Sequence, residues 1–194
     1  MIKKPFKIGV AGTHSTGKST LVSLVRRELE HKGLRVGQVE DLATRARDLG
    51  FPILKEHTFD STLWIMAECM RQEAELSLSS DVIIVDRPVP DALGYLLAAL
   101  EITGRSVEPR RLQELESIAV AHVGDYDVLV VTVVDKSLPL GPDRDTDAMF
   151  RQVAAEKVGD IIDRCAPGAI KMTYDNSNQV AEALIDACLR SHRG

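Results

Sequence analysis

Gly12-Thr13-His14-Ser15-Thr16-Gly17-Lys18-Ser19 is the stretch of sequence that decides the fold. It matches the phosphate-loop pattern, which is a glycine, four variable residues, a second glycine, a lysine and then a serine or threonine. Residues 6–11 before it read as a buried strand, and residues 20–29 after it read as an amphipathic helix. Because a helix N-terminus carries free N–H groups and partial positive charge, this turn predicts a binding site for a phosphate chain.

The residues of this loop have separate expected roles. Gly12–Ser19, together with Thr20, is expected to surround the phosphates of a nucleoside triphosphate. Lys18 should reach the terminal phosphates, and the hydroxyl of Ser19 should bind Mg²⁺. A glycine-rich turn with an exposed lysine is the alternative, but it does not explain why the strand, the loop and the helix agree.

The composition is that of an ordinary globular protein. Of the 194 residues, 44% are hydrophobic and 27% are charged, and the net charge is −5. A mildly acidic chain argues against a broad nucleic-acid-binding surface, and the apolar runs are too short to span a membrane. The three widely separated cysteines fit reduced thiols of a cytoplasmic protein. We therefore expect one cytoplasmic domain over residues 1–194, monomeric or homodimeric, with a small molecule as its partner.

Strand-like and helix-like stretches alternate along the chain, which predicts an α/β fold with a mostly parallel sheet. After residues 6–11, further strands are expected at residues 34–39, 81–86, 127–134 and 169–172. After residues 20–29, helical regions are expected at residues 43–79 with a break near Gly50, and at residues 91–102, 110–123, 148–164 and 178–190.

A second group of candidate residues ends the strand expected at residues 81–86. Phosphate-loop enzymes hold their metal with a carboxylate at the end of a hydrophobic strand, and Asp86 stands at that place. Parallel strands bring their carboxyl ends to the same edge as the phosphate loop, so Asp86 is the expected Mg²⁺ ligand. Arg87 adds a planar cation suited to a phosphate or a carboxylate. A helix-capping role for Asp86 and a surface salt bridge for Arg87 are the alternatives.

A segment rich in proline, glycine and aspartate covers residues 139–147, before a helix that carries Arg151. An arginine on a closing segment can stabilise the charge on a phosphoryl group during transfer. Arg144 and Arg151 are therefore candidate catalytic residues, and the segment is a candidate lid over about residues 139–150. Capping of the following helix by Asp145 or Thr146 is compatible with this role.

Taken together, the loop at Gly12–Thr20, the Asp86-Arg87 pair and the segment Asp143-Arg144-Asp145-Thr146-Asp147 resemble the small P-loop kinases of the nucleoside and nucleotide kinase superfamily. The likeness is greatest to the AAA-domain ATPase and kinase group that includes the nicotinamide riboside kinase domain. The resemblance implies a three-layer P-loop fold with a five-stranded parallel sheet in the order 2-3-1-4-5 and a short lid. It also implies ATP and Mg²⁺ as cofactors, and catalytic roles for Lys18, Asp86, Arg87 and Arg144.

The same resemblance implies an acceptor pocket at the ends of the second and third strands. Glu40 and Asp41 fall where related kinases often have an acidic residue that contacts the acceptor hydroxyl. An acid there could orient that hydroxyl or accept its proton. Arg45, Arg47 and Arg87 could hold an anionic acceptor. A helix-capping acid pair and a solvent-facing Arg45 are the alternatives. No acceptor signature stands out after Arg45, so the sequence leaves the acceptor open.

Two functions stay open at this point. The first is a kinase that transfers the γ-phosphate of ATP to a nucleoside, a nucleotide or a related ribosyl compound. The second is a nucleotide-dependent regulatory module that acts through a protein partner. Guanine-type switches are not expected, because the residues after Asp86 and after Val134 lack their motifs. The chain is also too short for the extra helical domain of an oligomeric mechanical ATPase.

Overall fold

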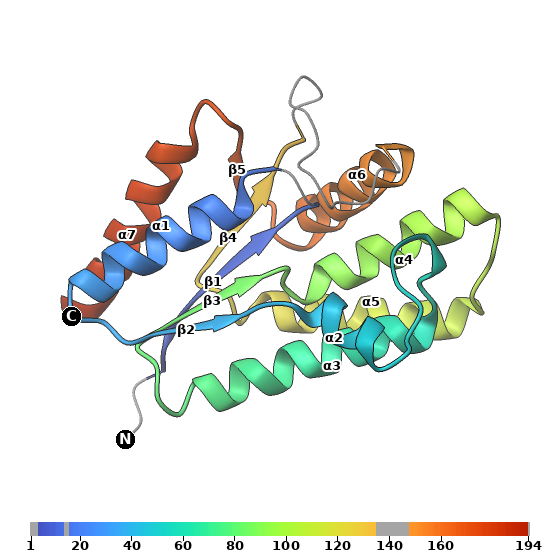
Figure 1. The fold of residues 1–194 in the computed structure, drawn as a ribbon, viewed down its shortest axis with the longest axis horizontal. Helices are drawn as coiled ribbons and strands as arrows, with labels where there is room; N and C mark the ends of the chain where they lie inside the picture. The colour runs from blue at the N-terminus through green and yellow to red at the C-terminus, as the bar shows by residue number, and fades with distance from the viewer. Residues whose placement is uncertain (1–3, 14–15, 135–147, 194) are drawn as a thin grey trace.

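The computed structural model describes residues 4–13, 16–134 and 148–193. Its centre is a five-stranded sheet in the order β2-β3-β1-β4-β5, in which every pair of neighbouring strands is parallel (Figure 1). The strands are β1 (Phe6–Ala11), β2 (Val36–Val39), β3 (Val82–Asp86), β4 (Val128–Thr132) and β5 (Ile170–Met172). The predicted fold class and strand order are thereby confirmed.

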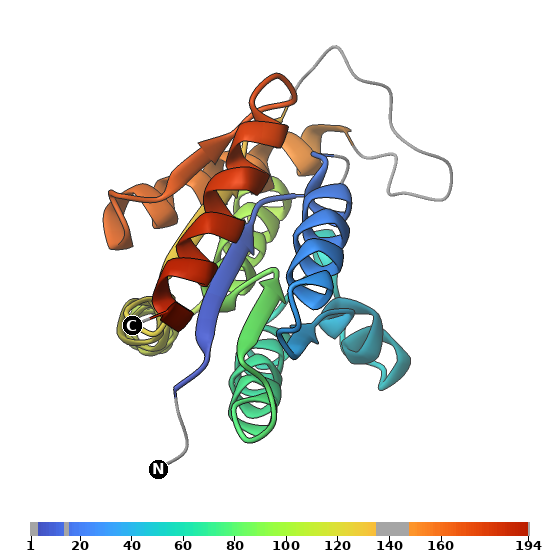
Figure 2. The same ribbon diagram turned by 90° about the vertical axis from the view of Figure 1, so that its left-hand side faces the viewer.

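Helices cover both faces of the sheet. They are α1 (Lys18–His31), α2 (Leu42–Asp48), α3 (Phe59–Leu76), α4 (Val89–Thr103), α5 (Pro109–Val123), α6 (Ala148–Cys165) and α7 (Ser177–Arg193), with a short 3₁₀ helix η1 (Leu54–Glu56). One face carries α1 and α7, and the other carries α3, α4, α5 and α6 (Figures 1 and 2). Among the described helices, none has the length and apolarity that a membrane crossing requires.

The central strands are hydrophobic over most of their length because both of their faces are buried. Ile8 and Ile84 pack with α1 and α7, whereas Ile83 and Val85 pack with the helices of the opposite layer. Strands covered on both faces read as continuous apolar runs. This is why β1, β3 and β4 could be predicted from short runs of valine and isoleucine.

The segment after β2 has the break that was expected near Gly50, and it also contains a short 3₁₀ helix that was not expected. The helical region expected at residues 43–79 is divided into α2, η1 and α3. A capping box starts α3, because the Thr58 hydroxyl accepts the N–H of Ser61 at 3.2 Å while the Ser61 hydroxyl accepts the N–H of Thr58 at 2.9 Å. Such a box satisfies two N–H groups that a helix start leaves without partners. The capping box thereby fixes where α3 begins after η1.

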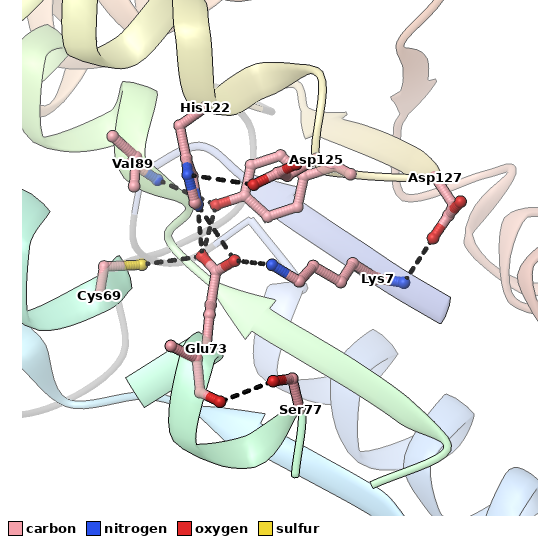
Figure 3. Close-up of polar contacts among 10 residues, drawn as sticks. Lys7, Cys69, Glu73, Ser77, Val89, His122, Asp125 and Asp127 are labelled. Atoms are coloured by element: carbon pink, nitrogen blue, oxygen red, sulfur yellow. Dashed lines mark hydrogen bonds and ion pairs between the residues drawn. The ribbon is translucent and has the colours of Figure 1, made fainter. Parts of the chain in front are cut away.

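A buried ionic cluster lies near the amino ends of β1 and β4 (Figure 3). Its centre is Glu73 of α3, which accepts hydrogen bonds from Lys7 at 2.9 Å, Tyr126 at 2.8 Å and Cys69 at 3.4 Å. The ring Nε2 of His122 lies 3.1 Å from both carboxylate oxygens. Burial raises the pKa of Glu73, but the hydrogen bonds from His122 and Lys7 outweigh it and lower that pKa to about 2. Glu73 is therefore a fully partnered buried carboxylate that ties α3 to β1 and α5.

Candidate functional site

The phosphate loop leaves β1 and enters α1 through two glycines in left-handed conformations. Gly12 has a φ of 122° and Gly17 a φ of 84°, and α1 begins at Lys18. A Cβ atom on Gly12 would lie 2.1 Å from the hydroxyl oxygen of Thr132. Glycine is required there on both counts, since other residues disfavour positive φ and no space exists for a side chain.

Contacts with β4 and within the loop fix the described part of the loop. The Thr16 hydroxyl donates to the Thr13 carbonyl at 2.9 Å and lies 2.7 Å from the Thr132 hydroxyl. Thr132 in turn donates to the Ala11 carbonyl at 3.1 Å. The ammonium group of Lys18 is buried and donates to the Thr13 carbonyl. The loop is therefore held in shape by side chains that the bare sequence pattern does not specify.

The Asp86-Arg87 pair lies beside this loop. Asp86 ends β3 in register with Val10 of β1, and the N–H of Arg87 donates to the Val10 carbonyl at 3.1 Å. Arg87 has a left-handed φ of 67°, and its guanidinium donates to the Tyr95 hydroxyl. Burial disfavours the charged guanidinium, but Tyr95 and the nearby aspartates outweigh it and raise the pKa of Arg87. Arg87 is therefore a fixed, permanently charged group at the end of β3.

Asp91 is a site residue that the sequence analysis used only as the expected start of a helix. Its side chain is buried, and its Oδ2 accepts the N–H of Gly12 at 2.9 Å. Burial raises the pKa of Asp91 above its usual range, although Arg87, Lys18 and the Gly12 N–H oppose that effect. The signal in the sequence is the spacing from Asp86, which places a second acid in the first turn of the helix after β3.

A cavity of about 470 Å³ opens beside Ser19 at the carboxyl ends of β2 and β3. Its polar lining comes from the first turn of α1, from the start of α2 and η1, and from the first turns of α4. The lining side chains with polar groups are Ser19, Asp41, Thr44, Arg47, His57, Asp86, Arg87, Asp91 and Tyr95. The cavity thus begins where the phosphate loop ends, as expected for ligands of open parallel sheets.

Backbone strain in the described chain is concentrated at this cavity. In the described chain, the non-glycine residues with positive φ are Asp41 at 58°, Leu54 at 57° and Arg87 at 67°. All of them line the cavity. A non-glycine residue in this conformation costs free energy, of order 1–3 kcal/mol each, and tends to mark ligand-binding regions. The packing of the surrounding fold therefore has to hold these three residues in unfavourable backbone conformations.

His57 is a second residue that sequence reasoning missed. It is buried, its Nδ1 lies 3.2 Å from the Ser61 hydroxyl, and its ring meets Tyr95 edge-on at 5.9 Å. Burial, with smaller contributions from the charges of Arg87 and Arg105, lowers the pKa of His57 to about 4. His57 therefore presents a neutral imidazole to the cavity at neutral pH. Its position depends on the η1 turn, so no local sequence pattern pointed to it.

The structure brings some of the predicted acceptor residues together and leaves others apart. Asp41 lines the cavity together with Arg87. Glu40 is exposed and accepts a hydrogen bond from the Gln38 amide at 2.6 Å, and it does not line the cavity. Arg45 also lies outside the lining and forms an ion pair with Glu68 of α3 at 2.6 Å. Arg47, two positions after Arg45 and named with it in the sequence analysis, does line the cavity, together with Thr44 of the same helix.

Of the residues predicted to bind the nucleotide, some lie at the cavity or the phosphate loop and others lie elsewhere. Ser19 and Thr20 are exposed in the first turn of α1. Arg151 is buried on α6 and lines a separate cavity of about 430 Å³ between the end of β4 and α6. His14, Ser15 and Arg144, with most of the candidate lid, lie outside the described residues.

Three buried side-chain oxygens in the described chain have no hydrogen-bond partner, and all three belong to this site. They are Thr13 Oγ1, Asp86 Oδ1 and Asp91 Oδ1. Buried polar atoms are nearly always paired, so such exceptions call for an explanation. Carboxylate and hydroxyl oxygens suit Mg²⁺, which keeps several waters and takes one or two carboxylates together with nucleotide phosphates. Asp86 supplies one such carboxylate with an unpartnered oxygen, and Ser19 supplies an exposed hydroxyl that lines the same cavity, so the two residues fit that pattern.

Comparison with known proteins supports the fold. The structure titled as NadR protein in complex with NR aligns with a TM-score of 0.67 at 12% identity, over 94% of this chain and 51% of that chain. Deoxyadenosine kinase from M. mycoides with bound dATP aligns with a TM-score of 0.59 at 12% identity, over 97% of this chain and 100% of that chain. The chain thus spans about half the length of the NadR chain that it matches.

No curated protein sequence matches the chain. The sequence pattern of the AAA domain family matches residues 7–183, from the second residue of β1 into α7. This match includes the phosphate loop, the Asp86-Arg87 pair and every strand of the sheet apart from the first residue of β1. The chain therefore belongs to the AAA domain family.

Proposed function

We propose that this protein is an ATP-dependent kinase that transfers the γ-phosphate to a small acceptor, namely a nucleoside, a nucleotide or a related ribosyl compound. The observation that carries the proposal is the shared border between the phosphate loop and the cavity, at which Ser19 and Asp86 lie. A donor site and an acceptor-sized space in contact are what direct phosphoryl transfer requires. One of the aligned structures is a deoxyadenosine kinase, which supports the same reading.

On the donor side, the loop N–H groups and the start of α1 would bind the triphosphate. Lys18, now bonded to the Thr13 carbonyl, would exchange that carbonyl for the terminal phosphates. Ser19 and Asp86 would hold Mg²⁺, which neutralises charge on the β- and γ-phosphates when bound. Arg87 would stabilise the transferring group from the end of β3.

On the acceptor side, the hydroxyl of the acceptor would lie in the cavity next to Ser19 and Asp86. The new O–P bond forms at the γ-phosphorus while the bond to the β-phosphate oxygen breaks, and ADP leaves. Asp41 is the proposed acceptor of the hydroxyl proton, because Asp86 is assigned to the metal and the oxygens of Asp91 are either bonded to Gly12 or buried.

The remaining expectations stay proposals. A lid over about residues 139–150, with Arg144 and Arg151 closing on the phosphates, would complete the donor site. Acceptor contacts of Glu40 and Arg45 would require these side chains to leave Gln38 and Glu68. A single domain over residues 1–194 and a cytoplasmic location belong to the same proposal.

The test is a screen for ADP release from MgATP with a panel of nucleosides, nucleotides and ribosyl compounds, with mass spectrometry of the products. We expect one group of acceptors to gain a single phosphate. Lys18→Ala should lower turnover by about 100-fold or more, as expected for the loss of a cation that stabilises the transition state. Lys32→Ala, just past the far end of α1, is the control and should match the wild type.

The regulatory alternative makes the opposite prediction. Tight MgATP binding in a calorimeter, combined with no phosphorylated product from any acceptor, would contradict the kinase. A regulatory module would then be favoured if a protein partner bound the ATP and ADP forms with different affinities.

A further inference from the structure

The first turns of α4 contact the ends of both central strands. Asp91 accepts the N–H of Gly12, the residue directly after β1, at 2.9 Å. Tyr95, one helical turn later, accepts a hydrogen bond from Arg87, the residue directly after β3. Side chains four residues apart lie on the same face of a helix. One face of α4 therefore holds the first residue of the phosphate loop and the arginine of the Asp86-Arg87 pair.

The same face of α4 also forms part of the cavity wall. Asp91, Ala92 and Tyr95 all line the cavity proposed for the acceptor. The start of the helix is fixed in turn, because the N–H of Val89 donates to the Tyr126 hydroxyl at 3.4 Å and the N–H of Asp91 donates to the Pro88 carbonyl at 2.8 Å. A ligand bound in the cavity would therefore contact Asp91 and Tyr95, the residues that hold Gly12 and Arg87.

Asp91 does not have the geometry of a group that reacts with a substrate. One of its oxygens is bonded to Gly12, and the other is buried without a partner. Without that bond the Gly12 N–H would be a buried donor lacking an acceptor, and the loop would have to shift to satisfy it. Gly12 cannot shift far, because Thr132 occupies the space next to its Cα.

We propose that Asp91 is a positioning residue that couples the acceptor cavity to the phosphate loop, through its hydrogen bond to Gly12 and the neighbouring Tyr95–Arg87 contact. Occupancy of the cavity and occupancy of the phosphate loop then favour the same placement of α4. Each ligand raises the affinity of the other by the same factor, as linkage requires. The anchoring of Gly12 stands by itself, whereas the coupling rests on the proposed function.

The first experiment measures the anchor in the free protein. Hydrogen exchange of the Gly12 amide is followed by NMR in the wild type, Asp91→Ala, Asp91→Asn and the control Glu101→Ala, an exposed acid on the same helix. Asp91→Ala should speed exchange by about tenfold, the equivalent of one hydrogen bond. Asp91→Asn keeps an acceptor oxygen and should stay within about threefold of the wild type. If Asp91→Ala does not fold, Asp91→Ser, whose side chain is too short to reach Gly12, replaces it.

The second experiment measures coupling. The Kd for MgATP is determined for the same variants with and without an acceptor identified in the screen, below the melting temperature of the least stable variant. We expect Asp91→Ala to weaken MgATP binding by about tenfold and to abolish the effect of the acceptor, with Asp91→Asn restoring most of both. A purely structural role would lower the melting temperature and leave the Kd and the coupling unchanged.

Either of two results overturns the proposal: a Gly12 amide that exchanges equally in the wild type and in Asp91→Ala, or MgATP binding and coupling that are insensitive to Asp91→Ala. A wild-type protein that does not bind MgATP would instead refute the proposed function, and the Gly12 exchange would still decide whether Asp91 holds the loop.

Discussion

Two buried acidic regions of this protein differ in how their oxygens are paired. Near the amino ends of the strands, Glu73 has partners on Lys7, Cys69, His122 and Tyr126 (Figure 3). At the carboxyl ends, Asp86 and Asp91 each keep a buried oxygen without a partner. A fully satisfied buried charge fixes one structure, whereas an incompletely satisfied one leaves capacity for a ligand. The comparison separates an ionic cluster that supports the fold from one that is available for function.

The largest effect is expected from Glu73→Gln. The substitution leaves the ammonium group of Lys7 buried without its counter-charge, which should lower the free energy of unfolding by about 3–5 kcal/mol. The Kd for MgATP should not change, because the cluster lies away from the cavity lining. Urea denaturation and calorimetry measure the two quantities. The control is Glu75→Gln, at an exposed position on the same helix. An equal loss of unfolding free energy in the control would contradict the role assigned to Glu73.

Asp86→Asn should show the reverse pattern. Loss of the proposed metal ligand should reduce turnover by about 100- to 1000-fold. The free energy of unfolding should fall by about 1 kcal/mol at most, because Asp86 Oδ1 has no hydrogen bond to lose and the substitution removes only a charge near Arg87. Steady-state kinetics at varied Mg²⁺ and urea denaturation give the two values. Asp81→Asn, just before the opposite end of β3, should leave turnover unchanged. A stability loss without a kinetic effect would place Asp86 among the structural carboxylates.

His57, in the cavity lining, should make the free energy of unfolding depend on pH. The pKa of His57 is lowered to about 4 in the folded protein from its ordinary value of 6.5, so the unfolded chain binds its proton first as pH falls. Stability should therefore drop between pH 6.5 and 4, by about 3 kcal/mol in full. The urea midpoint should depend less on pH across this range in His57→Gln than in the wild type. The control His31→Gln, at the exposed end of α1, should keep the wild-type slope, and an unchanged slope in His57→Gln would contradict the assignment.

The smallest effect is expected from Tyr126→Phe, which removes a hydroxyl that bonds to both regions. The Tyr126 hydroxyl donates to Glu73 and accepts the N–H of Val89 at the start of α4. Its removal should cost about 1–2 kcal/mol of stability and raise the Kd for MgATP no more than about threefold. Tyr174→Phe, at an exposed hydroxyl, should change neither. A large change in Kd would mean that the Glu73 cluster also positions α4.

The sequence placed some of the candidate residues at the cavity and missed others. Ser19 and Asp86 were predictable, because a local pattern places each at the end of a strand or at the start of a helix. Asp91 and His57 were not, because their roles depend on contacts with Gly12 and Tyr95, which are distant in sequence. Arg45 was expected near the acceptor, but Glu68 of α3 holds it outside the cavity. Pairing between helices of the same layer decided that outcome.

The sequence by itself determined the α/β class, the strand order implied by resemblance and the place of the phosphate loop, because apolar runs and glycine spacing are local properties. The break between α2 and α3 was also expected from Gly50, but only the tertiary structure decided that η1 forms within it and that the cavity forms next to Ser19. It also decided that Glu73 is fully paired while Asp86 and Asp91 are not. Those outcomes depend on which side chains meet across packed helices and strands, and a linear pattern does not encode that pairing.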